Sequence, residues 1–202
     1  KALPWTQEFR HLIRAEQDRQ AYFNTGHVPE FIGLPEPNER KLMEAAIRVR
    51  EGALSTASEL LAEVEAARRK SVGTLDDAPF DDFRDLDDLT LSVLEVLTSS
   101  GKYYWIPIDR VESIAFSPPE RPRDLLWRKA RLIVKDGPDG EVYLPVLYPG
   151  SAANGDDAVR LGRTTDWIGG DGEPVRGVGQ RTFLIGEEAI PIMELTTVAF
   201  EH

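Results

Sequence analysis

The sequence of 202 residues contains no cysteine, and this absence removes several kinds of chemistry at once. Without cysteine there can be no disulfide bond, no thiol nucleophile and no cysteine-based zinc site. A chain of this kind fits a reducing compartment such as the cytoplasm.

Histidine is almost as scarce, with three in the chain. His11 lies in a predicted helix, His27 in a proline-rich segment and His202 at the end of the sequence. No two of them have the spacing of zinc ligands. A Ser/His/Asp mechanism would need His11 or His27 as its base, but the sequence has no nucleophile-elbow motif to supply the serine. Zinc binding and histidine-based hydrolysis are therefore disfavoured.

Long apolar runs and extended basic clusters are also lacking. No stretch approaches the roughly 18 apolar residues of a membrane span, and the start of the chain shows no signal-peptide pattern. The net charge of −11 repels phosphate backbones. The longest basic run, residues 68–70, ends a predicted helix, where it complements the helix dipole. We expect no membrane, nucleic acid or cofactor as a partner.

Helical periodicity is what the first third of the chain does have. A helix is predicted over Trp5–Phe23 from the spacing of its apolar residues. Asn38 caps a second predicted helix, Glu39–Arg50, and Gly52 separates it from a third, Leu54–Arg69. Two helices joined in this way fold back as an antiparallel hairpin. The order of small and large residues resembles a tetratricopeptide pair, although any helical hairpin with alanines at its crossing would look similar.

Short runs separated by glycine and proline replace this periodicity beyond Phe80. Residues 73–79 are predicted as a linker or turn, and residues 149–179 as a long polar loop. The expected fold class is α+β, with a tetratricopeptide-like helical part over residues 1–72 and a mainly antiparallel β domain over residues 73–202. Strands are predicted at residues 91–98, 102–106, 111–116, 125–134, 141–147, 182–185 and 195–200.

Acidic residues crowd into the segment from Asp76 to Asp88. Carboxylate oxygens suit hard cations such as magnesium, and a metal-dependent hydrolase would use a set of them. The candidate ligands are Asp85, Asp87, Asp88 and Glu95. Nothing nearby resembles a calcium-binding loop or a phosphate-binding loop.

The other interpretation of the same acids is structural, and we favour it. Arginines close in sequence would pair with the carboxylates where the β domain begins, because a partly buried arginine–carboxylate pair is strong. The expected arginines are Arg84, Arg123 and Arg128, and the expected acids are Asp85, Asp87, Asp88 and Asp124.

Several motifs in a fixed order resemble those of one protein family. The helix containing residues 13–19 and the helical hairpin are similar to that family's preceding part. The motifs are Arg84-Asp85-Leu86-Asp87-Asp88, the segment 101–107 with Trp105, the segment 123–128 with Arg123, Asp124, Trp127 and Arg128, and the segments 144–150, 161–167 and 177–181. By this pattern the chain is identified as a member of the ImpE family, also called SciE-type or TagJ, of bacterial type VI secretion.

The resemblance implies a cytoplasmic, non-enzymatic adaptor. It implies a link to the small subunit of the contractile sheath, through a helix near that subunit's amino terminus, and indirectly to the sheath-disassembling ATPase. The family is usually longer at its amino end, so further helices are expected before Lys1. The resemblance implies no catalytic residues.

A groove beside the first helix is the expected binding site. Helix pairs with small residues at their crossing leave grooves, and such grooves bind amphipathic helices through residues spaced three or four apart. Trp5, Phe9 and Leu12 are expected to form one wall. The alternative is that this face of the helix is internal core.

Overall fold

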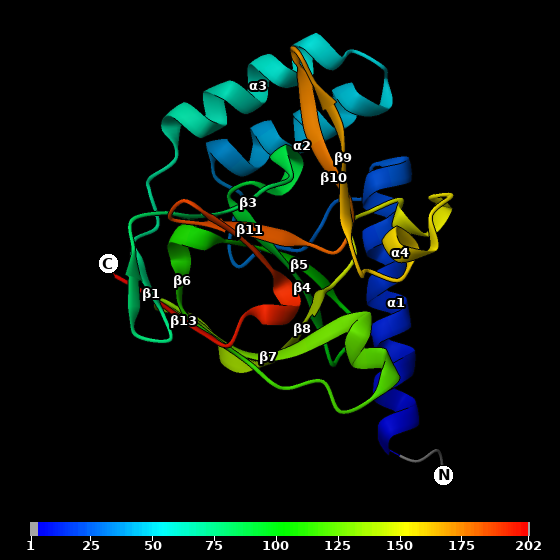
Figure 1. Cartoon of the computed structure of the whole chain (residues 1–202), viewed down its shortest axis with the longest axis vertical. Coiled ribbons are helices and arrows are strands. Elements are labelled where there is room, and N and C mark those ends of the chain that lie inside the picture. The colour runs from blue at the N-terminus through cyan, green and yellow to red at the C-terminus, as the bar shows by residue number, and fades with distance from the viewer. Residues whose placement is uncertain (1–3, 202) are drawn as a thin grey trace.

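The computed structural model describes residues 4–201. It begins with three helices, α1 (Pro4–Thr25), α2 (Pro37–Arg50) and α3 (Leu54–Ala67), and a single further α-helical turn, α4 (Asp157–Arg160), comes much later (Figure 1). Within the described range, no helix is both long and apolar enough to cross a membrane.

Local sequence explains where the helices begin and turn. The backbone N–H of Glu36 donates to the carboxylate of Glu39 at 2.5 Å, which stabilises the start of α2. Gly52, with φ of +77°, occupies the left-handed conformation that ends α2 and reverses the chain into α3. The resulting α2–α3 hairpin covers one side of the molecule (Figure 1).

The remainder of the chain is built mainly from antiparallel strands. The largest sheet has eight strands in the order β2-β1-β13-β6-β7-β8-β4-β5, and each neighbouring pair is antiparallel. A three-stranded sheet, β12-β11-β3, and a β9–β10 hairpin complete the set. The strands are β1 (Gly73–Leu75), β2 (Ala78–Phe80), β3 (Phe83–Asp85), β4 (Val93–Thr98), β5 (Tyr103–Pro107), β6 (Val111–Phe116), β7 (Trp127–Val134), β8 (Asp139–Pro145), β9 (Thr165–Gly170), β10 (Glu173–Gly179), β11 (Thr182–Ile185), β12 (Glu188–Pro191) and β13 (Thr197–Phe200).

Alternation along the strands sends side chains into two separate hydrophobic clusters. Leu94 and Val96 of β4 belong to the cluster enclosed by the strands, with residues of β5, β7, β8 and β11. Val93 and Leu97 belong to the cluster that also receives the buried faces of α1, α2 and α3. Glu95 falls between Val93 and Leu97, so the strand directs a carboxylate into the helix-facing side.

The structure confirms the α+β fold class. The helical hairpin is present, but α1 packs more extensively on β4 and β5 than on α2. The tetratricopeptide-like character and the division into parts 1–72 and 73–202 therefore stay predictions.

Two segments that were expected to lack strands form hairpins instead. Residues 73–79 contribute β1 and part of β2, and the presumed loop at 149–179 contains α4, β9 and β10. The β9–β10 reversal uses Asp171 and Gly172, both with positive φ. An Asp-Gly pair is a strong hairpin signal, but the many glycines and the lack of apolar alternation made the segment resemble a loop.

Gly177 in β10 provides a test of how tightly this hairpin packs. A Cβ atom at this position would lie 2.3 Å from the Tyr148 ring, which is itself buried. We expect Gly177→Ala to lower the free energy of unfolding by about 1–3 kcal/mol, as overpacking does. Urea denaturation measures the change.

The matched control is Gly140→Ala in β8, where an added Cβ meets nothing within 4 Å. We expect no loss of stability from this variant. Equal destabilisation by the two substitutions would contradict the close contact between Gly177 and Tyr148.

Candidate partner-binding surface and the buried charge network beneath it

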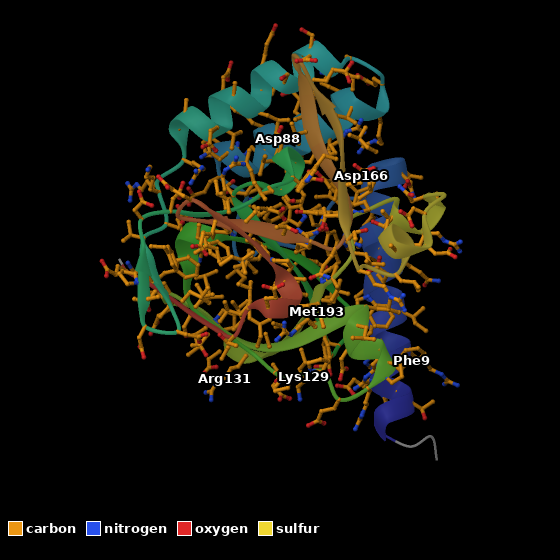
Figure 2. All side chains as sticks on the ribbon, in the orientation of Figure 1. Phe9, Asp88, Lys129, Arg131, Asp166 and Met193 are labelled. Atoms are coloured by element: carbon orange, nitrogen blue, oxygen red, sulfur yellow. The ribbon has the colours of Figure 1, made fainter. Side chains whose placement is uncertain are left out.

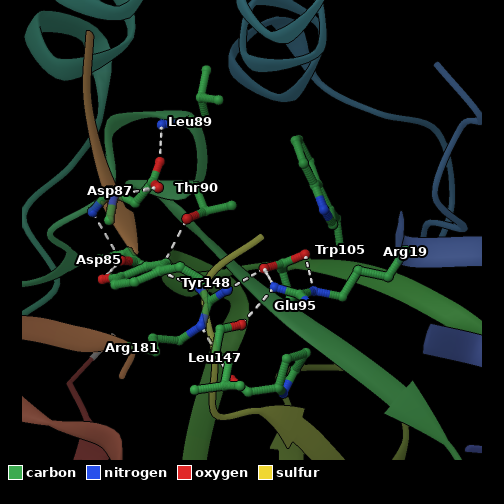
Figure 3. A network of polar contacts seen from close by, with 12 residues as sticks. Arg19, Asp85, Asp87, Leu89, Thr90, Glu95, Trp105, Leu147, Tyr148 and Arg181 are labelled. Carbon is green, nitrogen blue, oxygen red and sulfur yellow. Dashed lines mark hydrogen bonds and ion pairs between the residues drawn. The ribbon is translucent and has the colours of Figure 1, made fainter. Parts of the chain in front are cut away.

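A chain of four buried charged side chains runs through the helix-facing side of the molecule (Figure 3). Arg19 of α1 holds Glu95 of β4 in a bidentate pair, with Nε–Oε1 at 2.9 Å and Nη2–Oε2 at 3.2 Å. Arg181 lies between β10 and β11. Its Nη2 donates a hydrogen bond to Glu95, and its Nη1 donates one to Asp85 of β3. The order is therefore Arg19–Glu95–Arg181–Asp85, and none of the four is more than 2% exposed.

Neutral groups complete the hydrogen bonding of this network. Arg19 Nη2 also donates to the carbonyl of Leu147 at 2.9 Å. The Tyr103 hydroxyl donates to Glu95 at 2.5 Å and accepts from the indole N–H of Trp105 at 2.6 Å. Buried charges are stable only when they are paired and hydrogen-bonded in this way.

The carboxylate of Asp85, like that of Glu95, accepts four hydrogen bonds. Besides Arg181, it accepts hydrogen bonds from the Tyr148 hydroxyl at 2.7 Å, the Thr90 hydroxyl at 3.0 Å and the backbone N–H of Asp87 at 2.9 Å. The side chain of Asp87 accepts from the backbone N–H groups of Leu89 and Gly177, at 2.8 and 2.9 Å. Asp87 therefore joins the 3-10 turn η1 (Asp88–Thr90) to strand β10.

Burial and neighbouring charges move the pKa values of these groups in different directions. Burial opposes ionisation of Glu95, but Arg19 and Arg181 outweigh it and lower the Glu95 pKa. For Asp85, burial exceeds the attraction of Arg181 and raises the pKa. Burial, reinforced by the charge of Asp85, raises the pKa of Asp87 to about 7.

A surface groove lies beside α1, next to this network. Its volume is about 460 Å³, and it is lined by α1, by the start of β7 and by residues 145–153. Phe9, Ile13, Glu16 and Gln20 recur every three or four residues, so they share one face of α1. Glu16 and Gln20 line the groove, and Phe9 and Ile13 extend this wall towards the start of the helix. Phe9 and Ile13 are each 38% exposed.

The opposite wall is apolar at the same end. Leu126 and Trp127 line the groove, and Leu125 and Leu126 are about half exposed. The rings of Phe9 and Trp127 meet edge to face, with 6.0 Å between centroids, and the Trp127 indole N–H donates to Glu16 at 3.1 Å. Phe9 lies near the outer end of α1 (Figure 2).

Comparison with known proteins adds to this geometry. The family model described as ImpE protein matches residues 77–199. The chain belongs to the ImpE family. It is 32% identical over 200 residues to the protein of Pseudomonas aeruginosa named type VI secretion system accessory component TagJ, covering 99% of this chain and 69% of the relative. The ImpE resemblance found in the sequence motifs is thereby confirmed.

A solved structure has the same fold as this ImpE-family chain. The crystal structure of a protein from Vibrio parahaemolyticus superposes with a TM-score of 0.90 at 26% sequence identity. The match covers 98% of this chain and 74% of that protein.

The arginines expected to pair with the acidic segment do so only in small part. Arg123 approaches the adjacent Asp124 at 3.7 Å, but its closer partner is Glu8 of α1 at 2.8 Å. Arg128 donates instead to the backbone carbonyls of Ser117, Ile192 and Leu195. Arg84 donates to the backbone carbonyl of Asp85 rather than to its carboxylate. Within the expected set, the structure therefore has the Arg123–Asp124 pair and an attraction of Arg84 for Asp88, whereas the ion-pair partner of Asp85 is Arg181.

The partners of Asp85 and Glu95 come from distant parts of the chain, and this is why they were missed. Arg19 lies 76 positions from Glu95, and Arg181 lies 96 positions from Asp85. A signal for Arg19 did exist, because Leu12, Ala15, Arg19 and Tyr22 share the buried face of α1 at helical spacing.

The proposed metal ligands do not converge on one open site. Asp85 and Glu95 are each held by arginine, and Asp87 and Asp88 accept hydrogen bonds from backbone N–H groups of β10. Among the residues that the structure describes, no group of three or more acidic, histidine or cysteine side chains is arranged to hold a metal ion.

The residues of α1 that were predicted to form a groove wall differ in their exposure to solvent. Leu12 is fully buried in the helix-facing cluster, so its assignment to a partner-binding wall is wrong. Phe9 is partly exposed beside the groove. The side chain of Trp5 lies outside the described residues. Two tryptophans belong to the motifs that resemble the ImpE family. Trp105 lies in the core beside Tyr103, and Trp127 lines the groove.

Removal of Arg181 tests the network. Arg181→Ala would leave two buried carboxylates without their shared cation, and we expect a loss of about 3–5 kcal/mol in the free energy of unfolding. Arg131→Ala is the matched control, because Arg131 forms an exposed pair with Asp139. Urea denaturation should show a much smaller loss for the control, because solvent screens an exposed pair. Similar losses in both variants would contradict a stabilising role of the network.

The raised pKa of Asp87 predicts how stability depends on pH. The folded protein keeps this proton up to a pH of about 7, whereas the unfolded chain releases it near the ordinary value of 3.8. Stability contributed by the bound proton is therefore lost as pH rises between these values, by up to about 1.4 kcal/mol per pH unit. Urea denaturation from about pH 5 to about pH 8 measures this slope.

Asp87→Asn cannot titrate and should make the slope shallower, although the variant is less stable overall. Asp139→Asn changes an exposed carboxylate and should keep the slope of the original protein. An unchanged slope in Asp87→Asn would show that Asp87 is not the titrating group.

Proposed function

We propose that this chain is a non-enzymatic accessory adaptor of a bacterial type VI secretion system and that it acts in the cytoplasm. Its membership of the ImpE family and its 32% identity to TagJ of Pseudomonas aeruginosa, a type VI secretion system accessory component by name, support this role. The engagement of Asp85, Asp87, Asp88 and Glu95 by the protein's own donors supports the non-enzymatic part of the proposal.

The partner that we propose is the small subunit of the contractile sheath. An amphipathic helix near its amino terminus would bind in the groove beside α1, and this contact would link the adaptor indirectly to the sheath-disassembling ATPase. The observation that carries the proposal is a set of partly exposed apolar side chains at and next to the groove. Leu126 lines the groove, Phe9 packs on Trp127 of the lining, and Ile13 and Leu125 are their neighbours in the chain or on α1. Helix-in-groove binding uses apolar anchors at this kind of spacing.

The rigidity of α1 favours it as the wall of a binding site. Its buried face is tied to β4 through Arg19 and Glu95, and Glu8 joins it to Arg123 and Tyr143. His11 contacts the backbone carbonyl of Ser99 at 2.6 Å. A wall that is already ordered reduces the entropic cost of binding, because fewer groups have to be immobilised.

Peptide titration tests the site. A labelled peptide covering the amino-terminal helix of the small sheath subunit should bind with micromolar or better affinity, about −8 kcal/mol. Leu126→Asp places a charge in the lining of the groove, and Phe9→Asp places one beside Trp127 of that lining. Each should weaken binding at least tenfold, as measured by fluorescence anisotropy.

Leu34→Asp is the matched control. Leu34 is 86% exposed and is not part of the groove lining, so its substitution should leave the affinity unchanged. Thermal denaturation of each variant separates loss of binding from loss of folding. Failure of any sheath-subunit segment to bind the original protein would remove the functional proposal.

A further inference from the structure

A second groove lies between two hairpins, away from α1. One hairpin is formed by β1 and β2, and the other by β11 and β12. The groove between them has a volume of about 590 Å³. Figure 1 shows β1 on the opposite side of the molecule from α1, so this groove is separate from the surface assigned above.

The floor of the groove is apolar. Its side chains come from both hairpins and from the residue before β1; they are Val72, Leu75, Ala78, Pro79, Phe80, Ile185 and Ile190. Val72 is 38% exposed, and Leu75 and Ile190 are only partly buried although they pack against the core. An exposed apolar surface that is rimmed by polar residues is typical of an interaction site.

The rim of this groove is acidic and poorly neutralised. Asp81, Glu187 and Glu188 line it. Asp81 approaches Lys70 at 3.5 Å, with both side chains largely exposed. Glu187 and Glu188 form no ion pair with any residue in the described range 4–201.

Both flanking strands are edges of their sheets. β2 ends the eight-stranded sheet, and β12 ends the three-stranded sheet. Exposed sheet edges invite pairing with another chain, and charge on an edge discourages pairing with a like-charged one. A second copy of this chain would bring the same acids and a net charge of −11 to the contact. The charges therefore disfavour self-association here and favour a partner of opposite charge.

We propose that the groove between the β1–β2 and β11–β12 hairpins binds a partner segment in which apolar anchor residues are flanked by lysine or arginine. The apolar side chains of the partner lie on the floor formed by Val72, Leu75 and Ile190. Its basic residues neutralise Glu187, Glu188 and Asp81 on the rim. This surface is independent of the proposed sheath-subunit site and allows the adaptor to hold two partners at the same time.

A synthetic amphipathic peptide of leucine and lysine is the probe, and the same peptide with glutamate in place of lysine is its control. The lysine peptide should bind the protein more tightly at low salt than at high salt, and the glutamate peptide should not bind. Because an acidic protein attracts basic peptides in general, the decisive comparison is between two variants of equal charge.

The double variant Glu187→Lys/Glu188→Lys reverses the charge of two rim residues. The double variant Glu59→Lys/Glu112→Lys makes the same change of net charge at exposed positions outside the groove. We expect the rim variant to weaken binding of the lysine peptide at least tenfold and the control variant to weaken it less than threefold. Val72→Asp tests the floor and should also weaken binding, with folding checked by thermal denaturation.

Equal affinity for the two double variants, or no binding of the lysine peptide to the original protein, would overturn the proposal. Phe9→Asp should leave the affinity for the lysine peptide unchanged, because Phe9 lies beside the α1 groove. Loss of binding in Phe9→Asp would instead place the basic peptide beside α1 and would also overturn the assignment to the hairpin groove.

Discussion

The buried alternation of charges Arg19–Glu95–Arg181–Asp85 is the interaction on which the arrangement of the molecule depends. Each charge belongs to a different segment, namely α1, β4, the β10–β11 junction and β3. Burial of one of these groups alone would be very unfavourable, because a charge loses its hydration in the protein interior. The four segments therefore have to meet together, and the network favours one mutual arrangement over others. Tyr148 extends the network, since its hydroxyl joins Asp85 to the backbone of Thr182.

The same network gives α1 two different faces. Leu12, Ala15, Arg19 and Tyr22 fix one face against the sheet, whereas Phe9, Ile13, Glu16 and Gln20 lie on the neighbouring face beside the groove. Glu16 connects the two, because it contacts Arg19, Gln20 and Trp127. A helix anchored along one side and partly exposed along the next presents apolar side chains without losing its own position. This combination supports the proposal that the groove beside α1 binds a partner, because its wall is already ordered.

The acidic segment supports the β9–β10 hairpin. Asp87 and Asp88 accept hydrogen bonds from the backbone of Gly177 and Val175 in β10. At the end of the same strand, Gly179 donates to the Ser151 hydroxyl, which in turn donates to the carbonyl of Tyr148. Close approach of β10 to the Tyr148 ring requires a glycine at position 177. Acids in the motif that resembles the ImpE family thus have a clear structural task in positioning a hairpin that lies close to α3.

Local patterns in the sequence determined the parts of the fold that depend on neighbouring residues. The periodicity of Leu12, Leu42 and Leu61 with their neighbours predicted three helices, and short apolar runs predicted β4–β8, β11 and β13, because both signals arise within a few residues. The hairpins at 73–80 and 165–179 escaped detection, since glycine and aspartate made them resemble loops even though Asp171-Gly172 is itself a turn signal. Only the tertiary structure decided which arginines neutralise Asp85 and Glu95, whether Leu12 or Phe9 faces solvent, and that two apolar grooves lie on opposite sides. These features depend on contacts between residues far apart in the chain, and a linear pattern contains no information about which distant side chains the fold brings together.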